Sequence, residues 1–224
     1  MSQSSYGNPG GEIQREYERR ATKLAQERNA RSPLKKFLAT ILSVDAEDER
    51  RIENARKGAL GELEIGHLLD QIASNHGFVV LHDRAIPRSQ ANIDHILVTP
   101  AGVFVIDAKN YTGLVRIEEG ALLDFNAVPT LYIGNRKQTK LVLGVKKQVS
   151  HLESALGRVK LNVPVRGMLA FYKADFPWLF KPVEVDGVLI NGKGIEETVL
   201  NRQNSKVVDV AQVTEVLLRA FPSN

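Results

Sequence analysis

One stretch, residues 92–109, constrains the possible fold more than any other part of the sequence. Two runs rich in Val, Ile, Leu and Phe flank the segment Thr99-Pro100-Ala101-Gly102. Such runs favour strands, whereas Pro and Gly favour a turn. We therefore expect an antiparallel hairpin in which Thr99 faces Gly102. Because Pro is disfavoured in two-residue hairpin loops, the loop is expected to contain all four of these residues.

Three charged side chains share one face of this hairpin. In the expected register Asp94 faces Asp107, and Lys109 follows on the same side because side chains alternate along a strand. Opposed Cβ atoms lie about 4.5–5.5 Å apart, and like charges there are destabilising. A divalent cation removes the conflict, and carboxylate oxygens suit Mg²⁺ or Mn²⁺. The alternative is a pair of structural ion pairs, Asp107 with Lys109 and Asp94 with a neighbour such as Arg88. His95 points to the apolar face, where a hydrogen-bonded core histidine is expected.

Composition narrows the classes of protein. The 224 residues are 43% hydrophobic and 25% charged and contain no cysteine, which excludes a disulfide framework and a zinc–thiolate site. No apolar run is long enough for a membrane span, and the polar N-terminus does not resemble a secretory signal. We expect a cytoplasmic protein without a membrane partner. The net charge of +4 is compatible with an anionic partner.

The predicted elements alternate helix and strand. Residues 46–74 and 136–156 have helical periodicity, and residues 207–221 form a C-terminal helix. The expected strands are 78–82, the two arms of the hairpin, a meander at 114–117, 121–125 and 130–133, then 165–172 and 183–190. This order predicts an α/β fold with a mixed sheet flanked by helices in one domain, residues 46–224. Residues 1–45 form a charged N-terminal extension, partly disordered or helical.

Two further groups of residues are candidates for function. Glu62 lies on the apolar stripe of the first long helix with glycines around it, which indicates that another group approaches the backbone there; the alternative is an acid at the edge of the buried face. The second long helix and the segment before it carry a one-sided positive charge, and Gln148 borders the buried face of that helix. This charge favours phosphate contact or else marks a solvated surface, and the residues are Arg136, Lys137, Lys140, Lys146 and Lys147.

The order of motifs resembles the nuclease-related domain (NERD) family of the PD-(D/E)XK nuclease superfamily. The resemblance is carried by residues 58–62, 80–83, 92–95 and 102–110, in this order. It implies a restriction-endonuclease-like core, αβββαβ, with a β-meander insert. It also implies metal-binding acids at Asp94, Asp107 and Glu62, a catalytic lysine at Lys109, and a polar helix residue at Gln148.

The resulting hypothesis is a Mg²⁺- or Mn²⁺-dependent nuclease that hydrolyses DNA phosphodiester bonds with little sequence preference, RNA being the alternative substrate. Asp94, Asp107 and Glu62 would hold the metal, with the carbonyl of Ala108 as a further ligand, and Lys109 would assist the attacking water. One alternative is a nuclease-like fold that binds nucleic acid or assembles without cleaving. Another places the function in the charged N-terminal helix.

Overall fold

The structure is a computed structural model of the chain. It describes residue 19 and residues 44–119, 128–178, 181–192, 194–202 and 207–223. The predicted N-terminal extension, almost all of it, and the predicted strand at 121–125 lie outside these residues. In the part of the chain that is described, no helix is long and apolar enough to cross a membrane.

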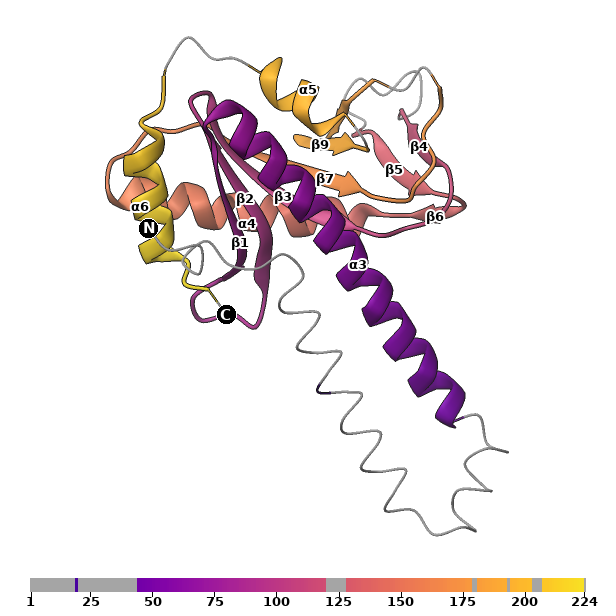
Figure 1. The fold of residues 1–224 in the computed structure, drawn as a ribbon. Coiled ribbons are helices and arrows are strands. Elements are labelled where there is room, and N and C mark those ends of the chain that lie inside the picture. The colour runs from indigo at the N-terminus through magenta and orange to yellow at the C-terminus, as the bar shows by residue number, and fades with distance from the viewer. Residues whose placement is uncertain are drawn as a thin grey trace.

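The predicted α/β architecture is confirmed, with helices covering a mixed six-stranded sheet (Figure 1). The strand order is β1-β2-β3-β7-β9-β8, and a separate three-stranded sheet β4-β5-β6 is inserted between β3 and α4. In chain order the elements are α3 Val44–His76, β1 Val79–Ala85, β2 Asn92–Thr99, β3 Gly102–Lys109, β4 Val115–Glu118, β5 Thr130–Ile133, β6 Arg136–Lys137, α4 Thr139–Arg158, β7 Val165–Phe171, β8 Val183–Val185, β9 Val188–Asn191, α5 Ile195–Leu200 and α6 Val210–Ala220.

The two faces of the sheet are covered by different helices. On one face α3 buries Ile65 and Leu69 against Phe104 and Ile106 of β3. On the other face α4 and α6 pack in a second apolar cluster that includes Ile96 of β2. In Figure 1, α3 crosses in front of strands β2 and β3 and α4 lies behind them. A third apolar cluster contains residues of α4, of β7 and of the inserted sheet. The insert, which follows β3 in the chain, is therefore packed against α4 and β7.

The hairpin has the predicted register but a shorter loop. Thr99 pairs with Gly102 and Val98 with Val103, as expected. Both strands reach the turn, however, so the loop contains only Pro100 and Ala101. The side chain of Thr99 stabilises this tight turn: its Oγ1 accepts a hydrogen bond from the Ala101 N–H at 3.1 Å and donates one to the Gly102 carbonyl at 3.0 Å.

Long-range contacts explain why β1 extends beyond the predicted strand to Ala85. The Ala85 N–H donates to the carbonyl of Pro222, and Arg84 Nε donates to the carbonyl of Phe221 at 2.8 Å. Arg84 is buried, and its guanidinium lies beside the end of α6. These partners are more than 130 residues apart in the sequence, and local pattern therefore predicts only the first part of the strand.

Three other boundaries differ from the predictions. The segment predicted as one strand at 183–190 is a hairpin, β8 and β9, because Asp186 and Gly187 both adopt positive φ angles, 50° and 76°. Two positive φ angles in an Asp-Gly pair are typical of a two-residue hairpin turn. Helix α4 begins at Thr139 because Arg136 and Lys137 form the short strand β6. The short helix α5 was not predicted.

Candidate functional site

The regular pairing of β2 and β3 ends just before the two acids. The last paired residues are His95 and Ile106. Beyond them, the Ala108 N–H donates a hydrogen bond of 2.9 Å to Oδ2 of Asp94. The expected direct pairing of Asp94 with Asp107 is absent from the β2–β3 ladder. At this position the Asp94 carboxylate, and not a backbone group of β2, accepts the hydrogen bond from β3. The strands open at the point where the predicted site begins.

Both carboxylates nevertheless approach the same cation. Lys109 Nζ lies 2.8 Å from Oδ2 of Asp107 and 3.8 Å from Oδ2 of Asp94. It also donates a 3.0 Å hydrogen bond to the carbonyl oxygen of Ala108. Asp94 and Asp107 retain only 9% and 8% of their accessible surface. Three oxygen atoms thus converge on one positive charge in a site that is largely shielded from water.

Burial and like charge shape the electrostatics of this group. Burial is the largest cause that raises the pKa of Asp94, to about 7, and the neighbouring Asp107 raises it further, against the opposing effects of Lys109 and the Ala108 N–H. Burial alone would lower the pKa of Lys109, but the two carboxylates more than compensate and raise it. Lys109 is therefore a cation at neutral pH, whereas Asp94 is close to its midpoint of ionisation.

Glu62 lies on α3, on the other side of the sheet from the cluster that contains Ile96. Its side chain is 1% exposed, and its backbone lies close enough to His95 to affect the pKa of that histidine. Among the residues that the structure describes, no three or more His, Cys, Asp or Glu side chains are grouped so as to hold a metal ion. The structure thus brings Asp94 and Asp107 together but shows no metal-binding group of described residues that includes Glu62. The metal-ligand role of Glu62 stays a prediction.

A chain of hydrogen bonds on the α3 side connects Asp70, His82 and His95. The Asp70 carboxylate lies 3.1 Å from His82 Nε2, and His82 Nδ1 lies 2.9 Å from His95 Nδ1. Burial is the main cause that lowers the pKa of both histidines. With neutral rings, His82 Nε2–H donates to Asp70 and His95 Nδ1–H donates to His82. His95 is the hydrogen-bonded core residue that its position predicted, whereas no sequence signal identified Asp70.

Gln148 on α4 reaches the strand that carries Asp94. Its Nε2 donates a 3.4 Å hydrogen bond to the carbonyl of Asn92, at the start of β2. Its Oε1 is buried and has no hydrogen-bond partner among the described residues. The recorded bond therefore attaches α4 to the backbone of β2, and a catalytic role of Gln148 is not tested by it.

The predicted basic residues are divided between different surfaces. Arg136 lines the large cleft described below, whereas Lys137 lines a smaller cavity of about 220 Å³. Lys146 forms a 2.6 Å ion pair with Asp186. Lys140 and Lys147 are exposed. One of the five predicted phosphate contacts thus borders the same cleft as Lys109.

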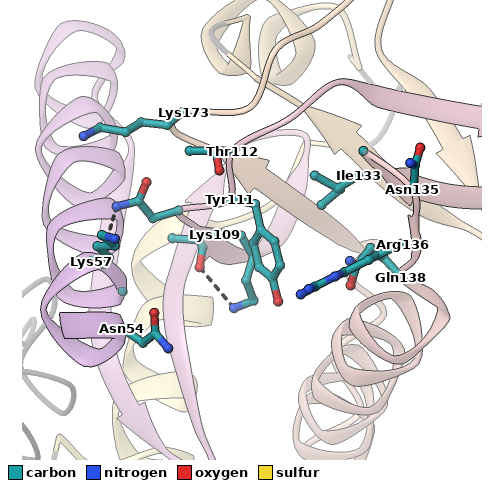
Figure 2. Close-up of a pocket in the computed structure, with 14 residues that line it drawn as sticks. Asn54, Lys57, Lys109, Tyr111, Thr112, Ile133, Asn135, Arg136, Gln138 and Lys173 are labelled. Atoms are coloured by element: carbon teal, nitrogen blue, oxygen red, sulfur yellow. Dashed lines mark hydrogen bonds between the residues drawn. The ribbon is translucent and has the colours of Figure 1, made fainter. Parts of the chain in front are cut away.

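This cleft, of about 920 Å³, opens beside Lys109 between α3 and the inserted sheet (Figure 2). Lys57 from α3, Arg136 from β6 and Lys173 after β7 join Lys109 around it, and Tyr111 projects into it. The sequence patterns did not identify Lys57, Tyr111 or Lys173. They come from three separate parts of the chain, which only the fold places together.

A family model described as the nuclease-related domain matches residues 57–172, just over half of the chain. The matched segment begins in α3, contains the hairpin, the insert and α4, and ends after β7. It therefore includes Asp94, Asp107 and Lys109. Neither a curated protein nor a solved structure matches the chain.

Proposed function

This chain belongs to the nuclease-related domain family, and from that premise we propose that it is a metal-dependent nuclease that hydrolyses DNA phosphodiester bonds with little sequence preference. RNA is the alternative substrate, because nothing at the site distinguishes the two sugars. Within the matched segment, the group formed by Asp94, Asp107, Ala108 and Lys109 is the proposed catalytic centre.

The observation that carries the proposal is the convergence of three oxygen atoms on one cation. Oδ2 of Asp94, Oδ2 of Asp107 and the carbonyl of Ala108 surround Lys109 Nζ at 3.8, 2.8 and 3.0 Å. Carboxylate and carbonyl oxygens are the hard ligands that Mg²⁺ and Mn²⁺ prefer. The donor set therefore suits a divalent ion, which these three residues would hold together with water and a phosphate oxygen. Glu62 remains a proposed further ligand.

A bound divalent ion would supply charge stabilisation on the phosphate and a lower pKa for an attacking water. Lys109 would contribute a second positive charge, because its raised pKa keeps it protonated at neutral pH. We assign it the stabilisation of negative charge on the phosphate and the orientation of the attacking water. Asp94 also holds the peptide between Asp107 and Ala108 in place, because its Oδ2 accepts the 2.9 Å hydrogen bond from the Ala108 N–H.

Substrate binding is proposed to rely on phosphate contacts. Arg136 borders the cleft beside Lys109, and exposed Lys140 and Lys147 are available on α4. Lys137 and Lys146 belong to the same proposal with less support, since Lys146 is paired with Asp186. Contacts of this kind bind the backbone and carry no sequence information directly. We therefore expect low sequence preference.

The alternative function is a nuclease-like fold that binds nucleic acid or assembles without cleavage. Two buried carboxylates beside one lysine argue against it, because one lysine offsets only one of two negative charges and an uncompensated buried charge destabilises the fold. The decisive assay incubates supercoiled plasmid with the protein in Mg²⁺, in Mn²⁺ and in EDTA. Nicking is expected in the metals and not in EDTA, and Asp107→Asn is expected to reduce it by more than about 100-fold, beyond the 10- to 100-fold effect of outer-shell changes at metal sites.

Arg158, which is exposed at the end of α4, supplies a control outside the proposed centre and the proposed phosphate contacts: Arg158→Ala should retain nicking. If wild-type protein binds plasmid without nicking it in either metal, and Asp107→Asn behaves identically, the alternative is correct. If the protein neither binds nor cuts, the charged segment before α3 becomes the place to look for function.

A further inference from the structure

The cleft beside Lys109 combines positive charge from several elements. Lys57 lies on α3, Arg136 on β6 and Lys173 after β7, and all three border the same space as Lys109 (Figure 2). Among the residues described by the structure, none that lines this cleft is acidic. Lys57 has an exposed neighbour, Glu53 at 3.7 Å, outside the lining. Exposed pairs of this kind are weak and exchange easily, so the cleft presents a net positive surface to a polyanion.

Tyr111 adds an aromatic surface to this positive cleft. Its side chain retains 37% of its accessible surface, which is unusual for an aromatic residue next to buried strands. The ring meets Phe171 edge to face, with 6.3 Å between ring centroids and an interplanar angle of 80°. Phe171 is 1% exposed and pairs with Lys109 between β7 and β3. Tyr111 is therefore supported from one side and faces the cleft a short distance from the proposed catalytic lysine.

A flat aromatic ring among phosphate-binding cations is the arrangement that proteins use for unpaired nucleic acid. Bases in a duplex are covered on both faces by their neighbours, so a side chain can stack on a base only where the strand is unpaired, frayed or flipped. Helix α4, all of which the structure describes, contains no Phe, Tyr or Trp, and its Lys146 is paired with Asp186. The observations thus favour the cleft over α4 as the place where a strand is gripped.

We propose that this cleft binds an unpaired nucleic-acid strand. Tyr111 stacks on a base, and Lys57, Arg136 and Lys173 contact the flanking phosphates. This grip places a phosphodiester beside Lys109 and makes single-stranded or frayed nucleic acid the preferred substrate. The substrate preference rests on the proposed nuclease function, but binding of the strand can be measured without any cleavage.

The test measures fluorescence anisotropy in EDTA with labelled dT and rU oligonucleotides of about 15 nucleotides and a blunt duplex of the same length. Wild-type protein should bind at least one single strand more tightly than the duplex. Tyr111→Leu, which keeps an apolar side chain against Phe171, should weaken single-strand binding by roughly 5- to 150-fold, the loss expected for one stacked base. Tyr111→Phe should retain it. Circular dichroism melting of each variant verifies that it is folded.

The cations have a separate signature. Removal of one phosphate contact lowers the slope of log affinity against log salt by about 0.7 for a single strand. Arg136→Ala and Lys173→Ala should each show this change, and Arg158→Ala at the exposed end of α4 should not. Tight duplex binding with weaker single-strand binding, or a folded Tyr111→Leu variant with wild-type affinity, would overturn the inference.

The results separate this inference from the proposed function. Tyr111-dependent binding of a single strand by a protein that never nicks DNA in Mg²⁺ or Mn²⁺ would support the binding site and refute the nuclease. Metal-dependent nicking by a protein whose single-strand affinity does not depend on Tyr111 would support the nuclease and refute the binding site.

Discussion

Strand β2 carries two neighbouring ionisable residues that face different surroundings. Asp94 joins Asp107 and Lys109, where two like charges lie near one cation. His95 belongs to a chain with His82 and Asp70, where both imidazoles have lowered pKa values and are neutral at pH 7. The two acids and the two histidines are all buried, but the group around Lys109 retains charge whereas both imidazoles are neutral.

The difference supports our proposal that the group around Lys109 is the functional one. Neutral, hydrogen-bonded side chains are compatible with burial and contribute to the packing of α3 against the sheet. A pair of carboxylates is not, because the ionised form of Asp94 is disfavoured by burial and by its neighbour. Buried pairs of like charges, which shift pKa values, are concentrated at functional sites. We therefore expect the group around Lys109 to lower the free energy of unfolding of the protein.

The largest expected effect comes from removal of the shared cation. In Lys109→Met, two buried carboxylates lose their partner, and we expect the free energy of unfolding at pH 8 in EDTA to fall by about 3–5 kcal/mol. The loss should be smaller at pH 5. The raised pKa of Asp94 means that its contribution to stability is full below its ordinary value of 3.8 and is lost as the pH rises through about 7. Urea denaturation at the two pH values measures the difference.

Two variants test the cause of this loss. Lys140→Met on the exposed surface of α4 removes a lysine without changing buried charge, so its free energy of unfolding should match that of the wild type. In the double variant Lys109→Met/Asp94→Asn, the neutral amide can still accept the Ala108 N–H, and part of the loss should be recovered at pH 8. Equal losses for Lys109→Met at pH 5 and pH 8 would show that packing, not charge, dominates this group.

The histidine chain should give the opposite dependence on pH. Because burial lowers the pKa of His82 and His95, their contribution to stability is present above about pH 6.5 and is lost as the pH falls. Each histidine that takes up a proton on unfolding steepens the decline by at most about 1.4 kcal/mol per pH unit. The double variant His82→Leu/His95→Leu should flatten this decline between pH 7 and pH 5 in urea denaturation.

His151, which is exposed on α4, supplies the matched control. His151→Gln should preserve the pH dependence of the wild type, since this side chain is exposed and lies outside the chain formed by Asp70, His82 and His95. A double variant that declines as steeply as the wild type would mean that other groups destabilise the protein in acid, and the contrast between the two sides of β2 would lose its electrostatic basis.

Local sequence patterns predicted the parts of the molecule that depend on near neighbours. The turn at Thr99 to Gly102 and the alternation of side chains in 92–109 were sufficient to place Asp94, Asp107 and Lys109 in one group. The helix over 46–74, the second long helix and the parallel strand after it followed from periodicity. Glycine near Glu62 correctly indicated a close approach, since a Cβ on Gly61 would lie 2.6 Å from Cβ of Asn110.

Features that depend on distant segments were not predictable in this way. The end of β1 is fixed by the carbonyls of Phe221 and Pro222, and the cleft requires Lys57, Tyr111 and Lys173 to meet from three regions. The positive residues at 136–156 predicted one basic helix surface. In the structure Arg136 and Lys137 belong to β6 instead, and Lys146 is paired with Asp186. The turn between β8 and β9, by contrast, has a local signal, because an Asp-Gly pair is typical of a two-residue hairpin turn.

The smallest predicted change in the free energy of unfolding concerns the packing of α3 against Asn110, just after β3. Alanine is favoured over glycine in a helix by about 1 kcal/mol. At Gly144 of α4 a Cβ would have no other atom within 4 Å, so Gly144→Ala should raise the free energy of unfolding by up to that amount. Gly61→Ala should instead lower it by about 1 kcal/mol, because overpacking of 1–3 kcal/mol exceeds the gain in helix propensity.

The contrast between these two glycines tests whether α3 is held rigidly beside the catalytic group. Asn110 follows Lys109 directly, and its Nδ2 donates a hydrogen bond to the carbonyl of Lys57 on α3. A displacement of Asn110 would therefore also shift Lys109, the proposed catalytic lysine. Urea denaturation of Gly61→Ala and Gly144→Ala under identical conditions gives the comparison. Equal stabilisation by both substitutions would mean that α3 moves away from Asn110 at little cost, and that the α3 side of the sheet adapts as readily as the solvent-facing surface of α4.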